Sequence, residues 1–510
     1  MANSSSNRRL FRKSINGKKC LIIGGGFGGI ACALRCRAIG YQVTLIERLN
    51  NLGGRAQVFE IDGFKHDAGP TLITAPFLIE ELFELFGENI NNYIELKPIT
   101  PWYRFVFHDG RTLDYGSDIE KLREEIASFL VDDVKGYDNL LKSSQSIYEV
   151  GFKKLAHQPF INFFSMIKQI PSLLKLRSDL TVGQLVQKHI KHPLLRQAFS
   201  IHPLLVGGNP FSTTSIYSLI HYLERKWGVY FCMGGTGSIV NALEDLMKRQ
   251  NIDILKGQDV KEIIVKNDRV SGIRLNNNQI ISANLVVCNA DPPMVYKEMI
   301  KPSVSLKTYI KRLIPERWTK YSMGLFVFYF GTRQKYPNVA HHTIWLGERF
   351  KSLLSDIFDK GILANDFSIY LHRPTATDPS FAPDGCDSFY ALCPVPNLLH
   401  PINWSIEGTK LRDRIVDALS KTILPDLKNN ITAEFWMDPR HFKRDYRAQY
   451  GAGFSIAPTF SQSAWFRYHN RDAKISNLYF VGAGTHPGAG LPGVISSAKV
   501  VETLLRQDIK

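Results

Sequence analysis

The sequence lacks the cysteine spacing that a zinc site or a disulfide framework requires. Its seven cysteines, scattered through 510 residues, include no CxxC or CxxH pair, and most have apolar neighbours. An odd, scattered set of this kind is typical of small buried thiols in a reducing compartment. We therefore expect no disulfides and no metal site.

Long apolar segments are also absent from the sequence. Crossing a bilayer takes about 18 or more apolar residues in a row, whereas the longest candidate here, MGLFVFYF at 323–330, has the length of a β-strand. The first 19 residues are polar and basic, and glycines interrupt the apolar run that follows, unlike in a signal peptide. We expect a cytoplasmic protein without a membrane-spanning helix.

Acidic residues are too few to balance the basic ones. The chain has 63 Lys and Arg against 47 Asp and Glu, which gives a formal charge of +16. An excess of this sign favours binding either to nucleic acid or to an anionic membrane surface. No nucleic-acid recognition motif accompanies it, so we expect no nucleic-acid partner.

Two basic stretches point to a membrane surface instead. Residues 151–177 contain no Asp or Glu and interleave basic side chains with large apolar ones, and residues 301–320 carry six basic residues and one Glu. This pattern is typical of a helix lying in an anionic lipid interface. A basic helix packed on the protein's own core gives the same pattern, and the sequence leaves both interpretations open.

A glycine-rich turn near the N-terminus has the form of a dinucleotide-binding loop. Residues 19–47 are typical of a strand, a tight turn, a helix and a second strand. Gly24, Gly26 and Gly29 match GxGxxG, and Glu47 follows 18 residues after Gly29. The glycines permit the turn and the approach of a pyrophosphate, and Glu47 would accept hydrogen bonds from a ribose diol. A carboxylate there disfavours a 2′-phosphate, so the pattern predicts FAD or NAD.

Two further segments favour FAD over NAD as the cofactor. Gly53, Gly54 and Arg55 form a GGR turn, and residues 67–71 read DAGPT. This arrangement resembles the flavoprotein amine oxidase and desaturase superfamily, in which the GGR turn meets the flavin's pyrophosphate and ribityl region and the DAGP segment lies by the isoalloxazine ring. The resemblance implies a Rossmann-like FAD-binding domain of the GR2 type.

The middle of the chain resembles a second part of that domain. An amphipathic helix over 237–250 precedes short strands expected at 252–255, 260–265, 270–275 and 281–288. The resemblance implies that the backbone of Val260 meets the adenine. We expect an α/β (α+β) protein with a discontinuous flavin domain over 18–100, 232–300 and 470–510. Residues 101–231 and 301–469 would form a substrate domain with a mixed sheet and a helical membrane-associating region.

Longer blocks narrow the resemblance to one family. They are FSIHPLLVGGNPFSTTSIYSLIHYLERKWGVYFCMGGTG at 199–237, HHTIWLGERF at 341–350, DFSIYLHRPTATDPSFAPDGC at 366–386, SQSAWFRYHNRD at 461–472 and NLYFVGAGTHPGAGLPGVISSAK at 477–499. From about residue 18 to its end, the chain resembles the bacterial and fungal type of phytoene desaturase. The resemblance implies an FAD-dependent enzyme, peripheral to a membrane, that introduces double bonds into phytoene toward neurosporene or lycopene. Oxygen or a quinone would accept the electrons.

The last block contains a second glycine-rich loop, FVGAGTHPGAGLPG at 480–493. Gly482 and Gly484 are expected to bring backbone to the phosphate–ribityl side of the flavin. A helix that opens near Gly493 and Val494 would aim N–H groups at the ring, so that both loops serve one FAD. The full set of expected cofactor contacts is Gly24, Gly26, Phe27, Gly28, Gly29, Glu47, Arg48, Gly54, Arg55, Gly69, Pro70, Thr71, Val260, Gly482, Gly484, Gly493 and Val494.

Catalysis in such an enzyme rests on the cofactor. A hydrocarbon offers no heteroatom, so we expect hydride transfer to flavin N5 and loss of a proton from the neighbouring carbon. An acidic residue considered for this family in the lipid-facing stretch has no counterpart here, since Phe152 to Ser178 contain no Asp or Glu. Candidate proton acceptors, by residue type alone, are His202, His341, His342 and His486. Aromatic residues that would line the substrate channel are Trp227, Tyr230, Phe231, Trp465 and Phe466.

Related functions stay open at the level of sequence. A C30 dehydrosqualene desaturase, a hydroxycarotenoid desaturase, a ketolase or an isomerase would be a sister carotenoid enzyme. A flavin amine oxidase shares the nucleotide scaffold, but the GGNPF and HHTIWLGERF blocks resemble desaturases. A non-catalytic prenyl carrier on the same scaffold is disfavoured by the intact Gly24, Gly26, Gly29, Glu47 and Arg55.

Overall fold

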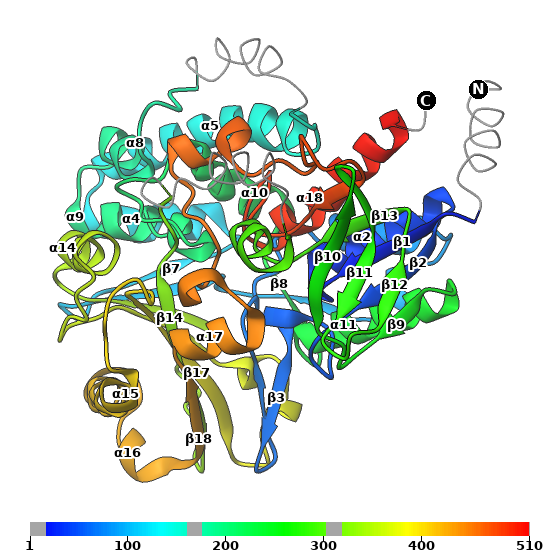
Figure 1. The fold of residues 1–510 in the computed structure, drawn as a ribbon. Helices are drawn as coiled ribbons and strands as arrows, with labels where there is room; N and C mark the ends of the chain where they lie inside the picture. Colours follow the sequence, from blue (N-terminus) through cyan, green and yellow to red (C-terminus); the bar gives the residue numbers. More distant parts are fainter. Residues whose placement is uncertain (1–16, 161–175, 302–318, 509–510) are drawn as a thin grey trace.

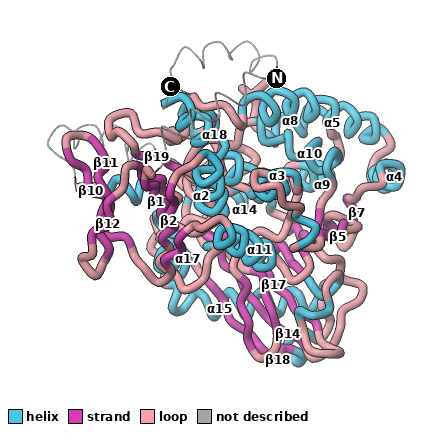
Figure 2. Tube along the Cα trace, turned by 90° about the vertical axis from the view of Figure 1, so that its right-hand side faces the viewer, coloured by secondary structure: helices cyan, strands magenta, loops and turns pink. Residues whose placement is uncertain are grey.

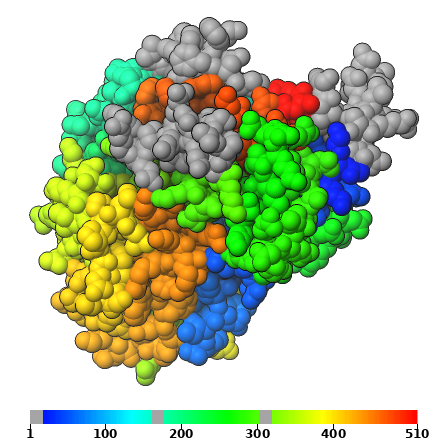
Figure 3. All heavy atoms as spheres, viewed as in Figure 1, coloured from blue at the N-terminus to red at the C-terminus, as the bar shows by residue number. Residues whose placement is uncertain are grey.

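The chain folds around two large β-sheets with helices packed on and between them (Figure 1). The computed structural model describes residues 17–160, 176–301 and 319–508. Segments far apart in the sequence share one face, where the N-terminal, middle and C-terminal parts lie side by side (Figure 3). The α/β fold expected from the sequence is confirmed, whereas the five-part division into domains stays a prediction.

The first sheet has five parallel strands that come from three separate parts of the chain. Its order is β19-β13-β1-β2-β9, and each neighbouring pair is parallel. The central strand has four buried residues in succession, as expected for a sheet that is covered on both faces. The strands are β1 (Lys19–Ile23), β2 (Gln42–Ile46), β9 (Asp253–Leu255), β13 (Leu285–Cys288) and β19 (Leu478–Phe480).

Helices from both ends of the chain meet beside this sheet. Helix α2 packs against α18 and against α11, and α18 also contacts α3 (Figure 2). Helix α2 ends at Gly40, whose φ of 115° and backbone N–H bonds to Cys36 O and Arg37 O form a left-handed C-cap. The bounds are α2 (Phe27–Ile39), α3 (Phe77–Glu84), α11 (Thr236–Arg249) and α18 (Leu491–Asp508).

The single strand predicted over 281–288 is wrong, because two strands of different sheets occupy this range. Strand β12 (Ile280–Ser282) belongs to a small antiparallel sheet with β10 (Val260–Lys266) and β11 (Arg269–Leu275). Strand β13 then joins the parallel sheet beside β1. The chain passes from one sheet to the other at residues 283–284, where apolar and polar residues alternate as in a single strand and hide the break.

The second sheet is mixed and has seven strands in the order β18-β14-β17-β16-β15-β6-β7. Its pairs are antiparallel except for β15 with β6, which run parallel. The aromatic segment singled out at 323–330 forms the fully buried strand β14. The strands are β6 (Tyr103–Phe107), β7 (Thr112–Tyr115), β14 (Gly324–Thr332), β15 (His342–Leu346), β16 (Ile369–His372), β17 (Asp387–Val395) and β18 (Ile431–Met437).

Two short antiparallel strand pairs and several helices complete the fold. The pairs are β3 (Val58–Ile61) with β4 (Phe64–Asp67) and β5 (Leu96–Pro98) with β8 (Tyr230–Cys232). Helix α10 packs on α5 and covers one side of the mixed sheet together with α4, α8 and α9 (Figures 1 and 2). The bounds of the other helices are α4 (Ile119–Phe129), α5 (Asp132–Val150), α8 (Val182–His189), α9 (Pro193–Phe199), α10 (Leu219–Trp227), α12 (Pro292–Met294), α14 (Phe350–Ser355), α15 (Trp404–Thr422), α16 (Leu427–Asn430) and α17 (Pro439–Tyr446).

No helix in the described ranges is long and apolar enough to cross a membrane. Two basic stretches, 151–177 and 301–320, were proposed for a membrane surface. Most of each stretch, residues 161–175 of the first and 302–318 of the second, lies outside the described residues. The membrane-associating region therefore stays a prediction.

Candidate functional site

A cavity of about 530 Å³ brings together most of the segments singled out in the sequence. Its wall includes residues of the first glycine loop, the GGR turn, the DAGPT segment and the last glycine loop. Of the expected cofactor contacts, those in the wall are Gly24, Gly26, Phe27, Glu47, Arg48, Gly54, Arg55, Gly69, Pro70, Thr71, Val260, Gly482, Gly493 and Val494.

The first loop turns sharply from β1 into α2 at the edge of this cavity. Gly24 has a φ of +96°, a conformation that side-chain-bearing residues rarely adopt. A Cβ atom on Gly29 would lie 1.9 Å from the carbonyl oxygen of Gly24, so the helix packs directly on the turn. Helix α2 begins at Phe27, and its first N–H groups and positive dipole end suit an anionic phosphate.

Glu47 braces this loop from the end of β2. Its Oε2 accepts a hydrogen bond from the Gly25 N–H at 2.7 Å, and its Oε1 accepts one from the Leu49 N–H at 2.8 Å. Burial raises the pKa of Glu47, and these backbone donors act in the opposite direction. Each carboxylate oxygen keeps a second lone pair, and Glu47 lines the cavity, so a ribose hydroxyl can still be bound there.

The GGR turn closes over the first loop and leaves an unused donor. The Gly53 N–H donates to Gly25 O at 2.8 Å, which joins the turn to the loop. Arg55 Nε is buried and has no hydrogen-bond partner among the described residues. A buried donor of this kind is costly unless it meets an acceptor, and flavin phosphate or ribityl oxygens would supply one. The residues present therefore fit a bound dinucleotide.

The last glycine loop approaches the first through Asn289, a residue that the sequence reasoning did not single out. A Cβ atom on either Gly28 or Gly482 would lie 2.5 Å from Asn289 Oδ1, so the two loops contact this amide from both sides. Gly482 has a φ of +98°. Asn289 follows the last residue of β13 and lines the cavity. Its position at the carboxyl end of a parallel strand is the signal that could have identified it.

Three of the expected contacts have packing roles in the structure. Gly28 and Gly29 lie where α2 meets the loops and are not part of the cavity wall that the described residues form. A Cβ atom on Gly484 would lie 2.5 Å from Pro292 Cδ, so this glycine permits the last loop to pack on the segment that follows β13. Gly493 and Val494, in contrast, lie in the first turn of α18 and line the cavity.

Arg467 fixes the last loop, and it too was missed from the sequence. Its guanidinium is buried and donates to four backbone carbonyl oxygens: Thr485 O at 3.1 Å, Gln462 O at 3.1 Å, Ile456 O at 3.2 Å and Ala483 O at 2.6 Å. Two of these carbonyls belong to the last loop. A buried arginine has no sequence signal that separates it from an exposed one.

Away from the glycine loops the cavity wall is mostly apolar. Residues of α10, of the mixed sheet and of the segment around 204–206 line it with aliphatic side chains. The apolar side chains in this part of the wall include Ile147, Leu155, Leu204, Leu205, Ile220, Leu223, Met323, Leu325, Ile344, Leu346, Ile369 and Leu392.

The aromatic residues expected in the channel lie elsewhere. None of Trp227, Tyr230, Phe231, Trp465 and Phe466 is in the wall of the cavity enclosed by the described residues. Trp227 donates its indole N–H to Tyr148 OH at 3.0 Å, and Phe231 packs against His341. The expectation does not hold for this cavity. For Trp227, Tyr230 and Phe231 the reason is that spacing in the sequence did not indicate which side of α10 and β8 faces the cavity, and Trp465 and Phe466 belong to a separate 3-10 turn over Ala464–Phe466. The aromatic residues that do line it include Tyr103, Phe152, Tyr217, Tyr370, Tyr390, Phe442, Tyr446 and Phe454.

The four candidate histidines occupy three different places, and one of them, His486, lines the cavity. Its Nε2 lies 3.0 Å from Leu155 O and can only donate there, which leaves Nδ1, unpartnered among the described residues, as the acceptor nitrogen. Burial lowers the pKa of His486 to about 4, so the ring is neutral near pH 7. His202 is part of a separate cluster with Glu224, described below.

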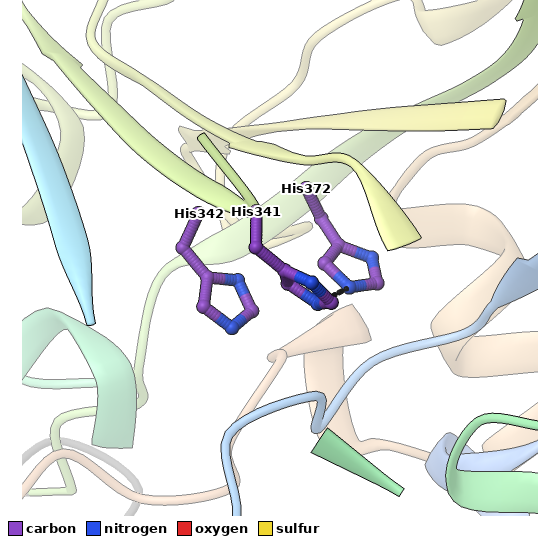
Figure 4. Close-up of side chains that lie close together, drawn as sticks. All are labelled: His341, His342 and His372. Atoms are coloured by element: carbon purple, nitrogen blue, oxygen red, sulfur yellow. Dashed lines mark hydrogen bonds between the residues drawn. The ribbon is translucent and has the colours of Figure 1, made fainter. Parts of the chain in front are cut away.

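His341 and His342 form a buried group with His372 at the end of β15 and β16 (Figure 4). His341 Nε2 lies 3.1 Å from His372 Nε2, and His342 Nδ1 lies 2.7 Å from the hydroxyl of Tyr370. Burial lowers the pKa of all three imidazoles, to about 3 for His341. One nitrogen from each ring lies within 4.8 Å of the others, a spacing compatible with a bound ion. The expected absence of a metal therefore stays a prediction, which metal analysis of the purified protein would test.

Hydroxyl groups connect these histidines to the cavity. Thr71 Oγ1 lies 3.0 Å from Tyr370 OH and 3.1 Å from Tyr390 OH, and Tyr390 OH also donates to Gly69 O at 3.2 Å. The DAGPT segment is thereby held against the mixed sheet. The cavity thus has a polar wall at this segment, next to the apolar remainder.

Comparison with known proteins agrees with this architecture. The family model for flavin-containing amine oxidoreductases matches residues 27–501. A lycopene-forming phytoene desaturase of Pseudescherichia vulneris is 45% identical over 494 residues, which is 97% of this chain and 100% of the relative. A neurosporene-forming phytoene desaturase of Cereibacter sphaeroides is 38% identical over 491 residues, 95% of this chain and 94% of the relative.

Among solved structures, the cyclohexylamine oxidase of Brevibacterium oxydans aligns with a TM-score of 0.61 at 15% identity. The alignment covers 96% of this chain and 99% of the oxidase, and at this identity it shows the fold alone. The expected FAD cofactor and the family resemblance are confirmed. The chain belongs to the flavin-containing amine oxidoreductase family, and within that family to the phytoene desaturases.

Proposed function

We propose that this chain is an FAD-dependent desaturase that introduces double bonds into phytoene and forms neurosporene or lycopene. One observation carries the proposal: a single cavity joins a dinucleotide-binding loop to a long apolar wall. A hydrocarbon needs such a wall, and its oxidation needs the cofactor beside it. The two curated relatives described above carry the same activity in their names.

The protein's own residues would hold, orient and shield the reactants. When bound, FAD supplies the oxidant that accepts a hydride from the substrate. The first glycine loop, Glu47 and Arg55 would hold its phosphates and ribose, and the first turn of α18 would face its ring. The aliphatic wall would align the polyene and keep water away from the carbon that loses hydride.

Access to such a substrate requires contact with a membrane, where phytoene dissolves. We therefore propose that the protein is cytoplasmic and binds a membrane surface peripherally, with oxygen or a quinone as electron acceptor. The formal charge of +16 and the basic stretches at 151–177 and 301–320 support this proposal. Flotation with vesicles tests it: binding should require anionic lipid and should weaken as salt is raised.

The activity itself is tested by expression in bacterial cells that accumulate phytoene. We expect coloured products, because each added double bond lengthens the conjugated system, and the pigment's absorption spectrum reports how many were added. Unchanged phytoene beside a purified yellow flavoprotein would refute the proposal and direct the search to the sister carotenoid enzymes. A purified protein that contains no flavin and gains none on incubation with FAD would favour a prenyl carrier.

A further inference from the structure

Of the acidic residues in the cavity wall that the described chain forms (Glu47, Glu224, Asp259, Asp291 and Asp445), Glu224 is the one on α10, among aliphatic residues, where a hydrocarbon substrate requires no carboxylate. Glu224 lies on α10 between cavity-lining aliphatic residues, among them Ile220 and Leu223. Its side chain is fully buried. Removing a carboxylate from water is costly unless hydrogen bonds compensate it, and hydrophobic replacements are often at least as stable. A buried carboxylate beside an otherwise apolar substrate site therefore suggests a role in the reaction.

Two side-chain donors hold this carboxylate in place. Tyr103 OH donates to Glu224 Oε1 at 2.6 Å, and His202 Nε2 donates to Oε2 at 3.0 Å. His202 Nδ1 has no partner among the described residues. The ring of His221 lies 4.0 Å from that of His202, and burial lowers the pKa of His221. Both oxygens of the Glu224 carboxylate are thus held by hydrogen bonds.

Within the described residues no Lys or Arg pairs with Glu224, and His202 Nε2 lies 3.0 Å from its Oε2. The neighbouring Arg225 points away from it, and its guanidinium donates to Tyr137 OH at 3.1 Å and Ser117 O at 3.1 Å. A charged group that is desolvated acts strongly on whatever lies beside it, because the local dielectric constant is low. The cavity is the space next to it.

A chain of contacts links the Glu224 carboxylate to the polar wall at the DAGPT segment. Tyr103, which binds Glu224, also lines the cavity, and its ring centroid lies 6.3 Å from that of His342. His342 binds Tyr370, which in turn binds Thr71. This chain of contacts connects Glu224 to the segment that the flavin ring is expected to meet.

We propose that Glu224 stabilises the cation formed on the polyene and accepts the proton that completes the double bond. The inference rests on the proposed function, with FAD as the hydride acceptor. Loss of hydride from one carbon leaves an allylic cation, and a negative charge placed beforehand next to the cavity lowers its energy. The C–H bond of the neighbouring carbon then breaks, its electron pair forms the new C=C bond, and the proton forms an O–H bond with the carboxylate.

The isosteric variant Glu224→Gln tests this assignment. It removes the charge and keeps the shape, so the purified protein should still bind FAD. Mixed without oxygen with vesicles of phosphatidylcholine and phosphatidylglycerol that contain phytoene, the variant should lose its visible flavin absorbance at least about 100-fold more slowly than the natural protein. Glu224→Asp keeps the charge on a shorter side chain and should recover part of the rate.

A matched control is the buried carboxylate of Asp133, which binds the backbone N–H groups of Lys191 and His192 and is not in the cavity wall. Asp133→Asn loses a buried charge as well, so a general effect of burial would appear in both variants. We expect its bound flavin to be reduced at the rate of the natural protein.

The outcomes separate this inference from the proposed function. If phytoene does not reduce the flavin of the natural protein, the proposed function fails. If it does, and the flavin of Glu224→Gln is reduced at a rate within about 3-fold of that of the natural protein, Glu224 has no such role. Should Glu224→Gln not retain FAD, Glu224→Asp decides: a rate equal to that of Asp133→Asn overturns the inference, and a rate at least about 10-fold lower supports it.

Discussion

Position 29 offers no space for a side chain, and this makes it the most sensitive point of the first loop. A Cβ atom there would lie 1.9 Å from the carbonyl oxygen of Gly24. Gly29→Ala must therefore move α2 away from the turn, and we expect the protein to be purified without FAD or with a small fraction of it. The ratio of flavin to protein absorbance measures this.

The control for that variant is Gly116→Ala. A Cβ atom at Gly116 would lie 3.5 Å from its nearest neighbour, an ordinary contact distance. It should keep the FAD content of the natural protein. A Gly29→Ala protein with full FAD content would contradict the packing described for this turn.

Among individual residues, sequence reasoning identified those whose role follows from the residue type and its local sequence pattern. Gly24, Gly29 and Arg55 were identified because a turn, a close approach and a fixed cation can each be inferred from the local pattern. Asn289 and Glu224 were missed because what matters is their position in space. One lies between two loops that are distant in the sequence, and the other faces a cavity from within an amphipathic helix. Neither fact has a local signal.

Among the elements, the last glycine loop depends on one side chain outside it. Arg467 donates to the carbonyl oxygens of Ala483 and Thr485 in the loop and to two more in the preceding segment. Arg467→Met would leave all four acceptors unpaired, and each buried unpaired group costs about 1–3 kcal/mol. We expect the free energy of unfolding to fall by at least about 3 kcal/mol. Weaker retention of FAD, measured by dialysis, should accompany this loss.

The control is Arg111→Met. Arg111 is about half exposed and pairs with Asp109 on the surface. Surface ion pairs of this kind contribute about 0–1 kcal/mol. Equal effects of the two variants on urea unfolding would show that Arg467 does not hold the loop.

Sequence periodicity predicted some boundaries of helices and strands but not others. Strands and helices of the nucleotide half were located well because glycines and short apolar runs mark their ends. The range 281–288 was taken as one strand because its polar residues, Ser282 and Asn284, fit the alternation of a single strand and do not mark the passage between two sheets. Which residues of β8 and α10 face the cavity could not be inferred either, since this depends on how α10 packs on α5.

For the whole molecule, the buried histidines make stability depend on pH. Burial lowers the pKa of His66, His157 and His486 to about 4 and that of His341 to about 3, from an ordinary value of about 6.5. The unfolded chain therefore binds protons near pH 6.5 that the folded protein does not bind. Their contribution to stability is complete above about pH 6.5 and is lost as the pH falls toward 4.

One buried acid, Asp67, changes the free energy of unfolding with pH in the opposite direction, but by less than the histidines do. Burial raises the pKa of Asp67 to about 6, so its contribution is largest at low pH and is lost as the pH rises through 6. At pH 5 each histidine with a pKa of about 4 has lost about 2 kcal/mol, whereas Asp67 has gained less than that. We expect the free energy of unfolding, measured with urea, to be at least about 4 kcal/mol lower at pH 5.0 than at pH 7.5. The variant His66→Gln should reduce this difference by about 2 kcal/mol, and a stability that is flat or rises on acidification would contradict the neutral, buried state of these rings.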